Sequence, residues 1–321
     1  MQKQRVRQTL KIFTGNAHPA LAQEICAELG VPLGKAHVGR FPDGEVRLQV
    51  LENVRGADVF VIQPTCRPVN DNLVELLVML DALSRASAAR ITAVMPYFAY
   101  ARQDRKDRPR VPISSKLVAD LLTSAGADRV LALELHAGQI QGFFDIPVDH
   151  LYATPVTVAY FRRLRLKNLV VVSPDTGGAL RARRLGRLLD APIAIIDKRR
   201  PRDDAVEVVH VVGDVAGMHA VIVDDLISTG GTLISASEAL KGKGATGVDV
   251  VATHGLLTEG ALERLREAPI DEICVTDTIP VSDPARVLDN HPRLRVLSVA
   301  PLIAEAIVRV HEGRSVSELF R

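Results

Sequence analysis

The chain of 321 residues is too long for one ordinary hydrophobic core, so we expect two domains, since single domains commonly hold about 100 to 200 residues. Hydrophobic residues make up 47% of the chain and charged residues 24%, which is typical of globular enzymes and excludes a disordered or collagen-like protein. The formal net charge of +2 excludes a strong overall field, so nucleic-acid binding is not expected and anions must be bound by local clusters.

The cysteines and the apolar runs indicate where the protein works. Cys26, Cys66 and Cys274 are odd in number and widely spaced, which predicts free thiols in a reducing compartment. No run reaches the roughly 20 apolar residues of a membrane span. The N-terminal apolar stretch is too broken for a signal peptide. The sequence therefore predicts a cytoplasmic protein that is not bound to a membrane.

Short apolar runs alternate with helical patterns along most of the chain, which is typical of parallel α/β layers. Leucines spaced three and four residues apart predict an amphipathic helix over residues 72–84. Continuous apolar strands predict sheets that are covered on both faces. The clearest strands are expected, in chain order, at residues 59–62, 91–95, 130–133, 169–172, 193–196 and 220–223.

The segment 143–150 lacks a helical period and separates two comparable α/β series. It therefore predicts a boundary between one domain at residues 1–150 and a second at residues 151–321. In open α/β sheets, ligands bind outside the carboxyl ends of the strands, so the residues after each apolar run are the candidates for chemistry.

The strongest motif follows the strand at 220–223 and precedes a helical pattern at 233–240; it reads Asp224-Asp225-Leu226-Ile227-Ser228-Thr229-Gly230-Gly231-Thr232. Its glycines allow close backbone approach, and the following helix N-terminus offers free N–H groups to a phosphate. The two carboxylates suit the paired hydroxyls of a ribose, which need acceptors. The motif lacks the Gly-Lys-Ser/Thr ending of a Walker loop. It predicts a monophosphate cradle.

This loop resembles the phosphoribosyl-diphosphate loop that phosphoribosyltransferases share with ribose-phosphate pyrophosphokinases. The segment 133–145, LELHAGQIQGFFD, is similar to the signature of the pyrophosphokinases and separates the two families. On a continuing strand, Glu134 and His136 would point to one side and could converge on a cation. The family usually has Asp in place of Glu134. The resemblance implies that His136 and Asp175 hold Mg²⁺, whereas the residues around Asp175 alone favour a helix cap.

Three further segments match the family, and the resemblance implies their roles. The basic run at 197–202 matches a catalytic loop in which Lys198 and Arg200 are the catalytic residues. The ATP-binding residues come from a turn at 40–45 and an aromatic-rich loop at 97–108, and they are Phe41, Asp43, Gly44, Glu45, Arg102, Gln103 and Arg105. The implied ribose 5-phosphate ligands are Arg200, Asp224, Asp225, Ser228, Thr229, Gly230, Gly231 and Thr232.

The resemblance extends from about Lys11 to Phe320 and implies two tandem phosphoribosyltransferase-type domains, each a mainly parallel sheet flanked by helices. The first domain would carry the ATP-binding segments and the second the ribose 5-phosphate loop. The implied reaction is Mg²⁺-dependent transfer of the β,γ-diphosphoryl group of ATP to the 1-hydroxyl of ribose 5-phosphate, for nucleotide biosynthesis. The implied assembly is a homo-oligomer, a hexamer, in which a neighbouring subunit supplies the Phe41 turn.

The sequence leaves two alternatives to the pyrophosphokinase activity. A phosphoribosyltransferase would leave the Arg102 loop and the His136 signature without a role. A regulatory, non-catalytic family member would tend to lose catalytic positions, which are present here. Ser228 stands where many bacterial members have Asp, so neither phosphate activation nor ADP inhibition is assumed, and the range of diphosphoryl donors stays open.

Overall fold

The computed structural model describes residues 8–199, 208–258, 260–281 and 293–320. The described chain divides into two compact units, each with one main sheet. The first unit runs to Tyr152 and also contains Thr278–Pro280 and the segment from Ala300. The second contains Ala153–Asp277 and Val281–Val299. The assignment of one ligand to each half of the sequence stays a prediction.

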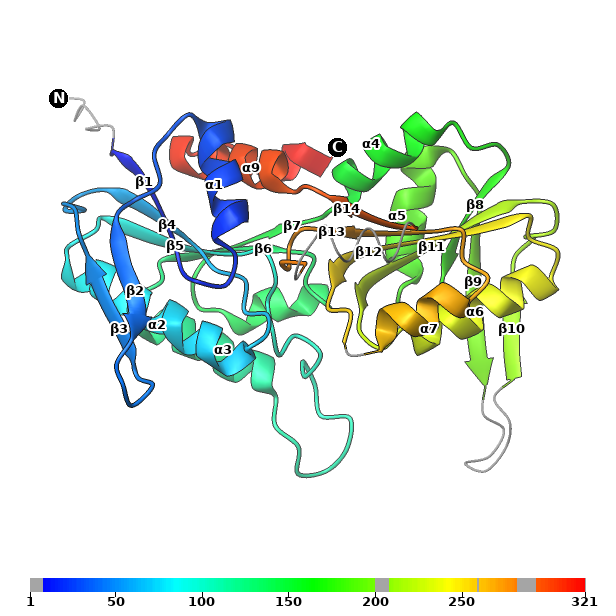
Figure 1. Cartoon of the computed structure of the whole chain (residues 1–321), viewed down its shortest axis with the longest axis horizontal. Coiled ribbons are helices and arrows are strands. Elements are labelled where there is room, and N and C mark those ends of the chain that lie inside the picture. Colours follow the sequence, from blue (N-terminus) through cyan, green and yellow to red (C-terminus); the bar gives the residue numbers. More distant parts are fainter. Residues whose placement is uncertain (1–7, 200–207, 259, 282–292, 321) are drawn as a thin grey trace. The chain divides into compact units, whose positions relative to one another are not determined.

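The first unit is built on a five-stranded parallel sheet. Its strands, in spatial order, are β1 (Leu10–Thr14), β4 (Asp58–Ile62), β5 (Arg90–Met95), β6 (Arg129–Leu133) and β7 (Val148–Leu151). All five residues of β4 are buried, as expected for a strand covered on both faces. Helices lie on both faces (Figure 1), namely α1 (Pro19–Leu29) and α9 (Ala300–Glu312) on one and α2 (Val69–Arg85) and α3 (Ser114–Ser124) on the other.

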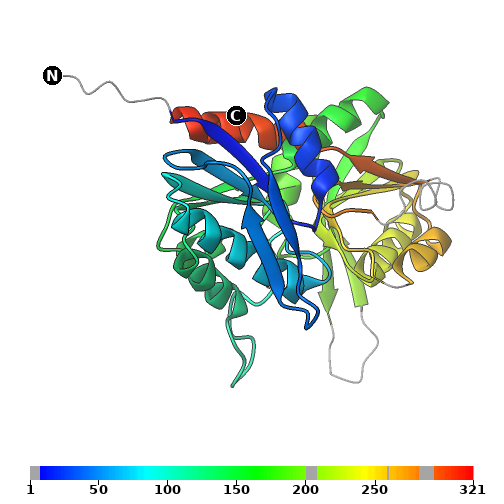
Figure 2. The same cartoon turned by 60° about the vertical axis from the view of Figure 1, so that its left-hand side comes forward.

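An antiparallel hairpin of β2 (Ala36–Arg40) and β3 (Val46–Val50) stands apart from this sheet and runs beside α2 (Figure 1; Figure 2). Short 3-10 helices lie at Gly138–Phe143 (η1) and Ser317–Phe320 (η2).

The second unit contains a seven-stranded sheet that is parallel except for one edge strand. In spatial order it consists of β10 (Val208–Val212), β9 (Ile193–Arg199), β8 (Leu169–Ser173), β11 (His219–Ile227), β12 (Gly247–Gly255), β13 (Glu272–Thr276) and β14 (Leu294–Leu297). β10 is antiparallel to β9. The expected α/β fold with two mainly parallel sheets is therefore confirmed.

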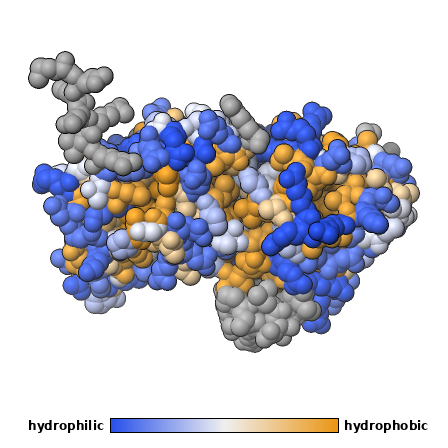
Figure 3. Space-filling view, turned by 90° about the horizontal axis from the view of Figure 1, so that it is seen from above, coloured by the Kyte–Doolittle hydropathy of each residue, from blue (hydrophilic) through white to orange (hydrophobic). Residues whose placement is uncertain are grey.

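Helices also cover both faces of the second sheet (Figure 1). α4 (Thr154–Leu164) and α5 (Ala179–Leu189) pack on one face, and α6 (Gly231–Gly242) and α7 (Ala261–Glu267) on the other. The outward sides of α4 and α5 carry arginines, which contribute to the hydrophilic surface seen in Figure 3. Among the described residues, no helix has both the length and the apolarity needed to cross a bilayer.

The predicted elements correspond closely to the observed ones. Each of the six expected strands lies within an observed strand, and the helix expected at 72–84 is the central part of α2. One difference concerns the expected boundary segment at 143–150, because β7 begins inside it and forms the edge of the first sheet. α9 is grouped with the first unit, where it packs against α1.

A partly buried ion pair joins the starts of β11 and β12. His219 Nε2 lies 2.8 Å from Asp249 Oδ2, and this hydrogen bond raises the pKa of His219 against the opposing effect of burial. A histidine with a raised folded pKa stabilises fully below its unfolded pKa, about 6.5, and loses that contribution as pH rises through the folded value. We therefore expect His219→Ala to lower the melting temperature more at pH 5.5 than at pH 9.

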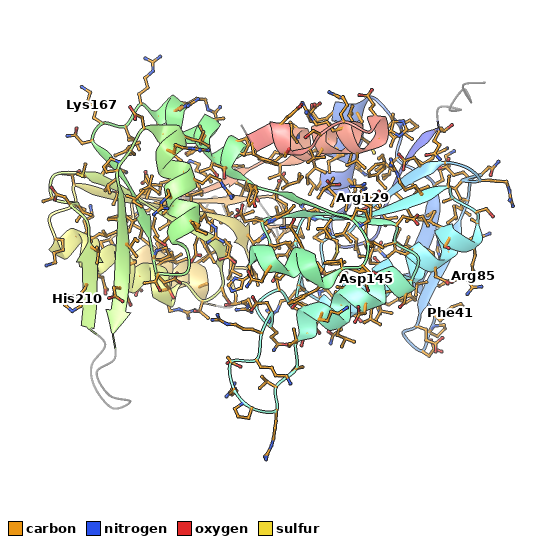
Figure 4. All side chains as sticks on the ribbon, turned by 180° about the vertical axis from the view of Figure 1, so that it is seen from behind. Phe41, Arg85, Arg129, Asp145, Lys167 and His210 are labelled. Carbon is orange, nitrogen blue, oxygen red and sulfur yellow. The ribbon has the colours of Figure 1, made fainter. Side chains whose placement is uncertain are left out.

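The exposed His210 of β10 provides the matched control (Figure 4). His210→Ala should change the melting temperature little at either pH. An equal loss for His219→Ala at both pH values would show that the imidazole stabilises by packing alone.

Candidate active site

The acidic pair and the segment after β8 lie at the same edge of the second sheet. β8 and β11 are neighbouring parallel strands, with Val172 opposite Ile222, so the residues that follow these two positions come together. Asp224 and Asp225 lie in the last part of β11. This is the edge at which open α/β sheets bind ligands.

A guanidinium from α5 lies beside the acidic pair. Arg181 Nη1 is 3.5 Å from Asp224 Oδ1 and 3.8 Å from Asp225 Oδ1, and the Asp225 N–H donates to Asp224 Oδ1 at 2.8 Å. Burial and the adjacent Asp225 carboxyl raise the pKa of Asp224, and the Arg181 charge opposes that increase. The pair therefore retains a proton to higher pH than a free aspartate would.

The loop after β11 has the geometry of an anion cradle. Gly230, the N-cap residue of α6, has a left-handed φ of 81°, and a Cβ there would lie 2.9 Å from Leu265 Cγ, so both backbone and space require glycine. In the described part of the chain, the backbone N–H groups of residues 229–232 have no acceptor. Four consecutive donors at a helix N-terminus favour a phosphate.

Two carbonyl groups of this loop accept hydrogen bonds from residues that follow β12. Both the N–H and the hydroxyl of Thr258 donate to Ser228 O at 3.1 Å, and Arg264 Nη2 donates to Thr229 O at 3.0 Å. These bonds satisfy the acceptors of the loop and leave its donors for an anion. Sequence reasoning missed the supporting roles of Thr258, Arg264 and Arg181. Only the strand order, which motifs do not reveal, brings these residues to the loop.

Asp175 lies in the turn between β8 and α5. Its Oδ1 accepts a 2.8 Å bond from the N–H of Gly178, the N-cap residue of α5, and Ser173 Oγ donates to Asp175 O at 2.7 Å. Asp175 Oδ2 accepts no hydrogen bond from any described residue. Asp175 thus binds the N-cap residue and is not itself the helix cap that the local sequence favours, and one carboxylate oxygen is left for a ligand.

The expected arrangement of Glu134 and His136 is wrong. β6 ends at Leu133, and Glu134 has a left-handed φ of 46°, so the strand does not continue through the signature. Glu134 is buried with 6% exposure, whereas His136 is exposed. The two side chains therefore do not share the face of a strand. A left-handed backbone at a non-glycine residue is often found at functional sites.

The loop with Arg102, Gln103 and Arg105 follows β5, and the signature follows the adjacent β6. The three side chains are exposed. Gln103 O accepts from the Ser115 N–H at 3.3 Å and from the Ser115 hydroxyl at 2.8 Å. Gln139 of η1 donates to Asp104 at 2.7 Å. These bonds place the loop beside the signature segment in the first unit.

The predicted adenine-binding residues form the turn of the β2–β3 hairpin. Phe41 N donates to Glu45 O at 2.8 Å, Gly44 N donates to Phe41 O at 2.9 Å, and Glu45 N donates to Asp43 Oδ1 at 3.2 Å. The Phe41 ring is 45% exposed, with the Arg47 guanidinium carbon 5.8 Å from its centroid. Figure 4 shows Phe41 at the outer edge of the first unit, away from the 97–108 loop.

Part of the predicted site is not described by the structure. Lys198 belongs to β9, but its side chain and the whole of Arg200 lie outside the described residues. His136 belongs to the first unit and Asp175 to the second, so their pairing stays a prediction. Within the ranges that the structure describes, no three His, Cys, Asp or Glu side chains form a metal-binding group.

The sheets and the phosphate-type loop define an α/β protein with the phosphoribosyltransferase type of fold. A family model described as the N-terminal domain of ribose phosphate pyrophosphokinase matches residues 10–126. A second, described as the phosphoribosyl synthetase-associated domain, matches residues 199–321. The chain belongs to the ribose-phosphate pyrophosphokinase family.

The similarity extends over nearly the whole chain. The ribose-phosphate pyrophosphokinase of Caldanaerobacter subterraneus subsp. tengcongensis is 55% identical over 317 residues, which are 98% of this chain and 99% of that protein. The Chromobacterium violaceum enzyme of the same name is 54% identical over 97% of this chain and 95% of its own length. A crystal structure of phosphoribosylpyrophosphate synthetase from Mycobacterium smegmatis has a TM-score of 0.89 at 44% identity, covering 95% of this chain and all of that one.

Proposed function

We propose that the protein acts in the cytoplasm and transfers the β,γ-diphosphoryl group of ATP to the 1-hydroxyl of ribose 5-phosphate. The products are 5-phosphoribosyl 1-diphosphate and AMP, and the first serves nucleotide biosynthesis. The observation that carries the ribose 5-phosphate part of this proposal is the set of four adjacent N–H groups at residues 229–232, without acceptors among the described residues, beside a partly buried acidic pair. The transfer from ATP is supported by the family to which the chain belongs.

Ribose 5-phosphate would bind with its phosphate at the loop and its hydroxyls at the acidic pair. The N–H groups of residues 229–232 and the N-terminal dipole of α6 attract the phosphate. The side chains of Ser228 and Arg200 would add polar contacts to it. Asp224 and Asp225 then accept hydrogen bonds from the ribose hydroxyls. Arg181 holds the two carboxylates in place from the side of α5.

ATP would bind between the 97–108 loop of one subunit and the hairpin turn of another. Arg102, Gln103 and Arg105 are exposed and can reach a triphosphate. The exposed Phe41 ring offers a stacking face, and Asp43 and Glu45 can accept hydrogen bonds from an exocyclic amine. In Figure 4, Phe41 lies away from the 97–108 loop of its own unit, which supports a homo-oligomer, by resemblance a hexamer, in which the hairpin turn of one subunit completes the ATP site of another.

In the reaction, the anomeric oxygen attacks the β-phosphorus, and the bond between the α,β-bridging oxygen and that phosphorus breaks to release AMP. Such transfers depend on positioning and on neutralising the charge of the transferring group. Lys198 and Arg200 would supply that positive charge. The oriented carboxylates of the ribose site hold the attacking sugar close to the reaction geometry.

His136 and Asp175 would hold Mg²⁺, Asp175 through a carboxylate oxygen and His136 through the water shell of the ion. This ion prefers oxygen ligands and is commonly bound through one or two carboxylates and substrate phosphates, and the remaining oxygen of Asp175 fits that donor set. When bound, Mg²⁺ supplies positive charge against the phosphate oxygens.

One assay tests the proposed function. The protein is incubated with ribose 5-phosphate, ATP and Mg²⁺, and AMP and phosphoribosyl diphosphate are measured. We expect equal amounts of the two products and no reaction without ribose 5-phosphate. Consumption of phosphoribosyl diphosphate with a nucleobase, without formation of AMP from ATP, would instead identify a phosphoribosyltransferase. A folded protein that performs neither reaction would support a regulatory role.

A mixing experiment tests the shared site. Phe41→Ala should weaken ATP binding because it removes the stacking face, and Lys198→Ala should abolish most turnover. Since each variant supplies the part that the other lacks, oligomers mixed from both should recover activity. Failure to recover, with subunit exchange demonstrated by mass spectrometry, would place the whole site within one chain.

A further inference from the structure

A closed hydrogen-bond cluster lies after β1 in the first unit, centred on Glu75 of α2. Glu75 is only 4% exposed, and its carboxylate accepts three hydrogen bonds. Oε1 accepts from Asn16 N at 2.6 Å and from Gln63 Nε2 at 2.8 Å, and Oε2 accepts from Asn16 Nδ2 at 2.8 Å. Burying a carboxylate costs free energy unless it is hydrogen-bonded, so the bonds from Asn16 and Gln63 stabilise Glu75 in its buried position.

The cluster leaves little freedom to the segment after β1. Gln63 is fully buried, and its side-chain oxygen accepts from Ala17 N at 3.1 Å. A Cβ on Gly15 would lie 2.5 Å from Gln63 Oε1 and 2.6 Å from Glu75 Oε1, so only glycine fits there. The position of Asn16 is therefore set by Glu75 and Gln63.

Asn16 connects the Glu75 cluster to the β2–β3 hairpin. Its Nδ2, besides bonding to Glu75, donates to Val38 O of β2 at 3.3 Å. A second contact lies nearer the turn, where Arg40 NH groups lie 3.4 Å from Asp71 of α2 and 3.0 Å from Gly44 O. Asp71 and Glu75 are four residues apart and so lie on one face of α2. This face of α2 thus contacts the hairpin directly through Asp71 and indirectly through Glu75 and Asn16.

The hairpin needs such contacts because an isolated two-stranded hairpin is only marginally stable. Its inward residues, Ala36, Val38, Leu48 and Val50, pack against the core of the first unit. Apolar packing has no preferred direction, whereas a hydrogen bond fixes both distance and angle. The polar contacts of Asn16 and Asp71 therefore add a directional restraint on the position of the turn with Phe41.

We infer that Glu75 is a positioning residue for ATP, acting through Asn16 on the β2–β3 hairpin whose turn carries the adenine-binding residues. This inference rests on the proposed function of that turn. Glu75 itself lies within the unit and touches Asn16 and Gln63, so its effect on ATP is indirect.

Asn16→Ala is the decisive variant, because Asn16 is exposed and the protein should fold without its side chain. We expect hydrogen exchange over residues 36–50 to quicken at least about fivefold, as lost hydrogen bonds of ordinary strength allow. The KM for ATP should rise about fivefold, while the KM for ribose 5-phosphate and kcat change less than about twofold. Glu75→Gln, which offers one acceptor oxygen where two are used, should act in the same direction.

Matched controls separate positioning from general damage. Gly15→Ala should reproduce the effect by pushing Gln63 and Glu75 apart, whereas Gly242→Ala meets no atom within 4 Å and should change neither exchange nor KM. Glu28→Gln, on the exposed side of α1, is the control for Glu75→Gln.

Unchanged exchange over residues 36–50 in Asn16→Ala would overturn the inference. Faster exchange with an unchanged KM for ATP would show that the position of the hairpin does not affect ATP binding. Equal increases in the KM for ATP and the KM for ribose 5-phosphate, together with a lower melting temperature, would indicate a merely structural role. If the wild-type protein forms no AMP, the proposed function fails, while the exchange measurement still tests whether Glu75 and Asn16 position the hairpin.

Discussion

Lys198→Ala should lower turnover by at least about a hundredfold while changing the melting temperature little. Lys198 is the residue before the last of β9, and its cation would neutralise charge that develops on the transferring diphosphoryl group. This charge is spread most widely in the transition state, so turnover should fall more than the affinity for either substrate. Steady-state kinetics and equilibrium binding of ATP and ribose 5-phosphate, measured on one preparation, provide the comparison.

Lys167→Ala supplies the control, because Lys167 is an exposed lysine of the same unit that lies outside the proposed site (Figure 4). It should retain normal turnover and binding. Near-normal turnover of Lys198→Ala would remove Lys198 from the mechanism. A loss of substrate affinity with unchanged turnover would instead assign the lysine to ground-state binding.

The fold could be predicted from the sequence because its strands are continuous apolar runs. β4, β5 and β6 are each buried between layers of helices, which selects for β-branched and other apolar residues at most positions after the first. The amphipathic spacing in α2 was equally informative, since its leucines form one buried face. These elements could be read from local patterns alone.

Features that depend on long-range packing could not be read in this way. α9 follows the second series of strands along the chain, yet it packs against α1 in the first unit. Its junction includes His311 of α9, whose Nδ1 lies 2.7 Å from the buried Asp58 carboxylate. Arg90 bonds to the same carboxylate and to Val310 O. No local sequence motif predicts these contacts, because the residues are far apart in the chain.

The candidate site shows the same division. The order of strand, acidic pair, loop and helix was visible in the sequence, and the left-handed Gly230 at the start of α6 agrees with the predicted cradle. The contact of Arg181 with Asp224 depends on the adjacency of β8 and β11, which the sequence does not state. At Glu134, the assumption of a continuing strand failed because the backbone adopts a positive φ directly after β6.

Asp224→Asn should lower turnover roughly tenfold to a hundredfold, because it exchanges an anionic acceptor beside the ribose hydroxyls for a weaker neutral one. The loop donors at 229–232 remain, so ribose 5-phosphate should still bind but be poorly oriented for attack. Burial and Asp225 raise the pKa of Asp224, so at low pH the wild-type carboxyl is itself neutral. The difference in turnover between wild type and variant should therefore widen as pH rises through that pKa.

The competing view makes Asp224 a structural residue that supports the strand end by accepting the Asp225 N–H bond. This view predicts that Asp224→Asn lowers the melting temperature, because the asparagine accepts the Asp225 N–H less well. It also predicts normal kinetics in the folded fraction, because the side chain would have no contact with the sugar. Asp214→Asn is a suitable control, since the exposed Asp214 also accepts a nearby backbone N–H, from Ala216 at 3.1 Å, outside the site. Melting temperature, ribose 5-phosphate affinity and turnover, compared at pH 6 and pH 9 for both variants, separate the views. Normal kinetics with reduced stability would exclude Asp224 from the orientation of the sugar.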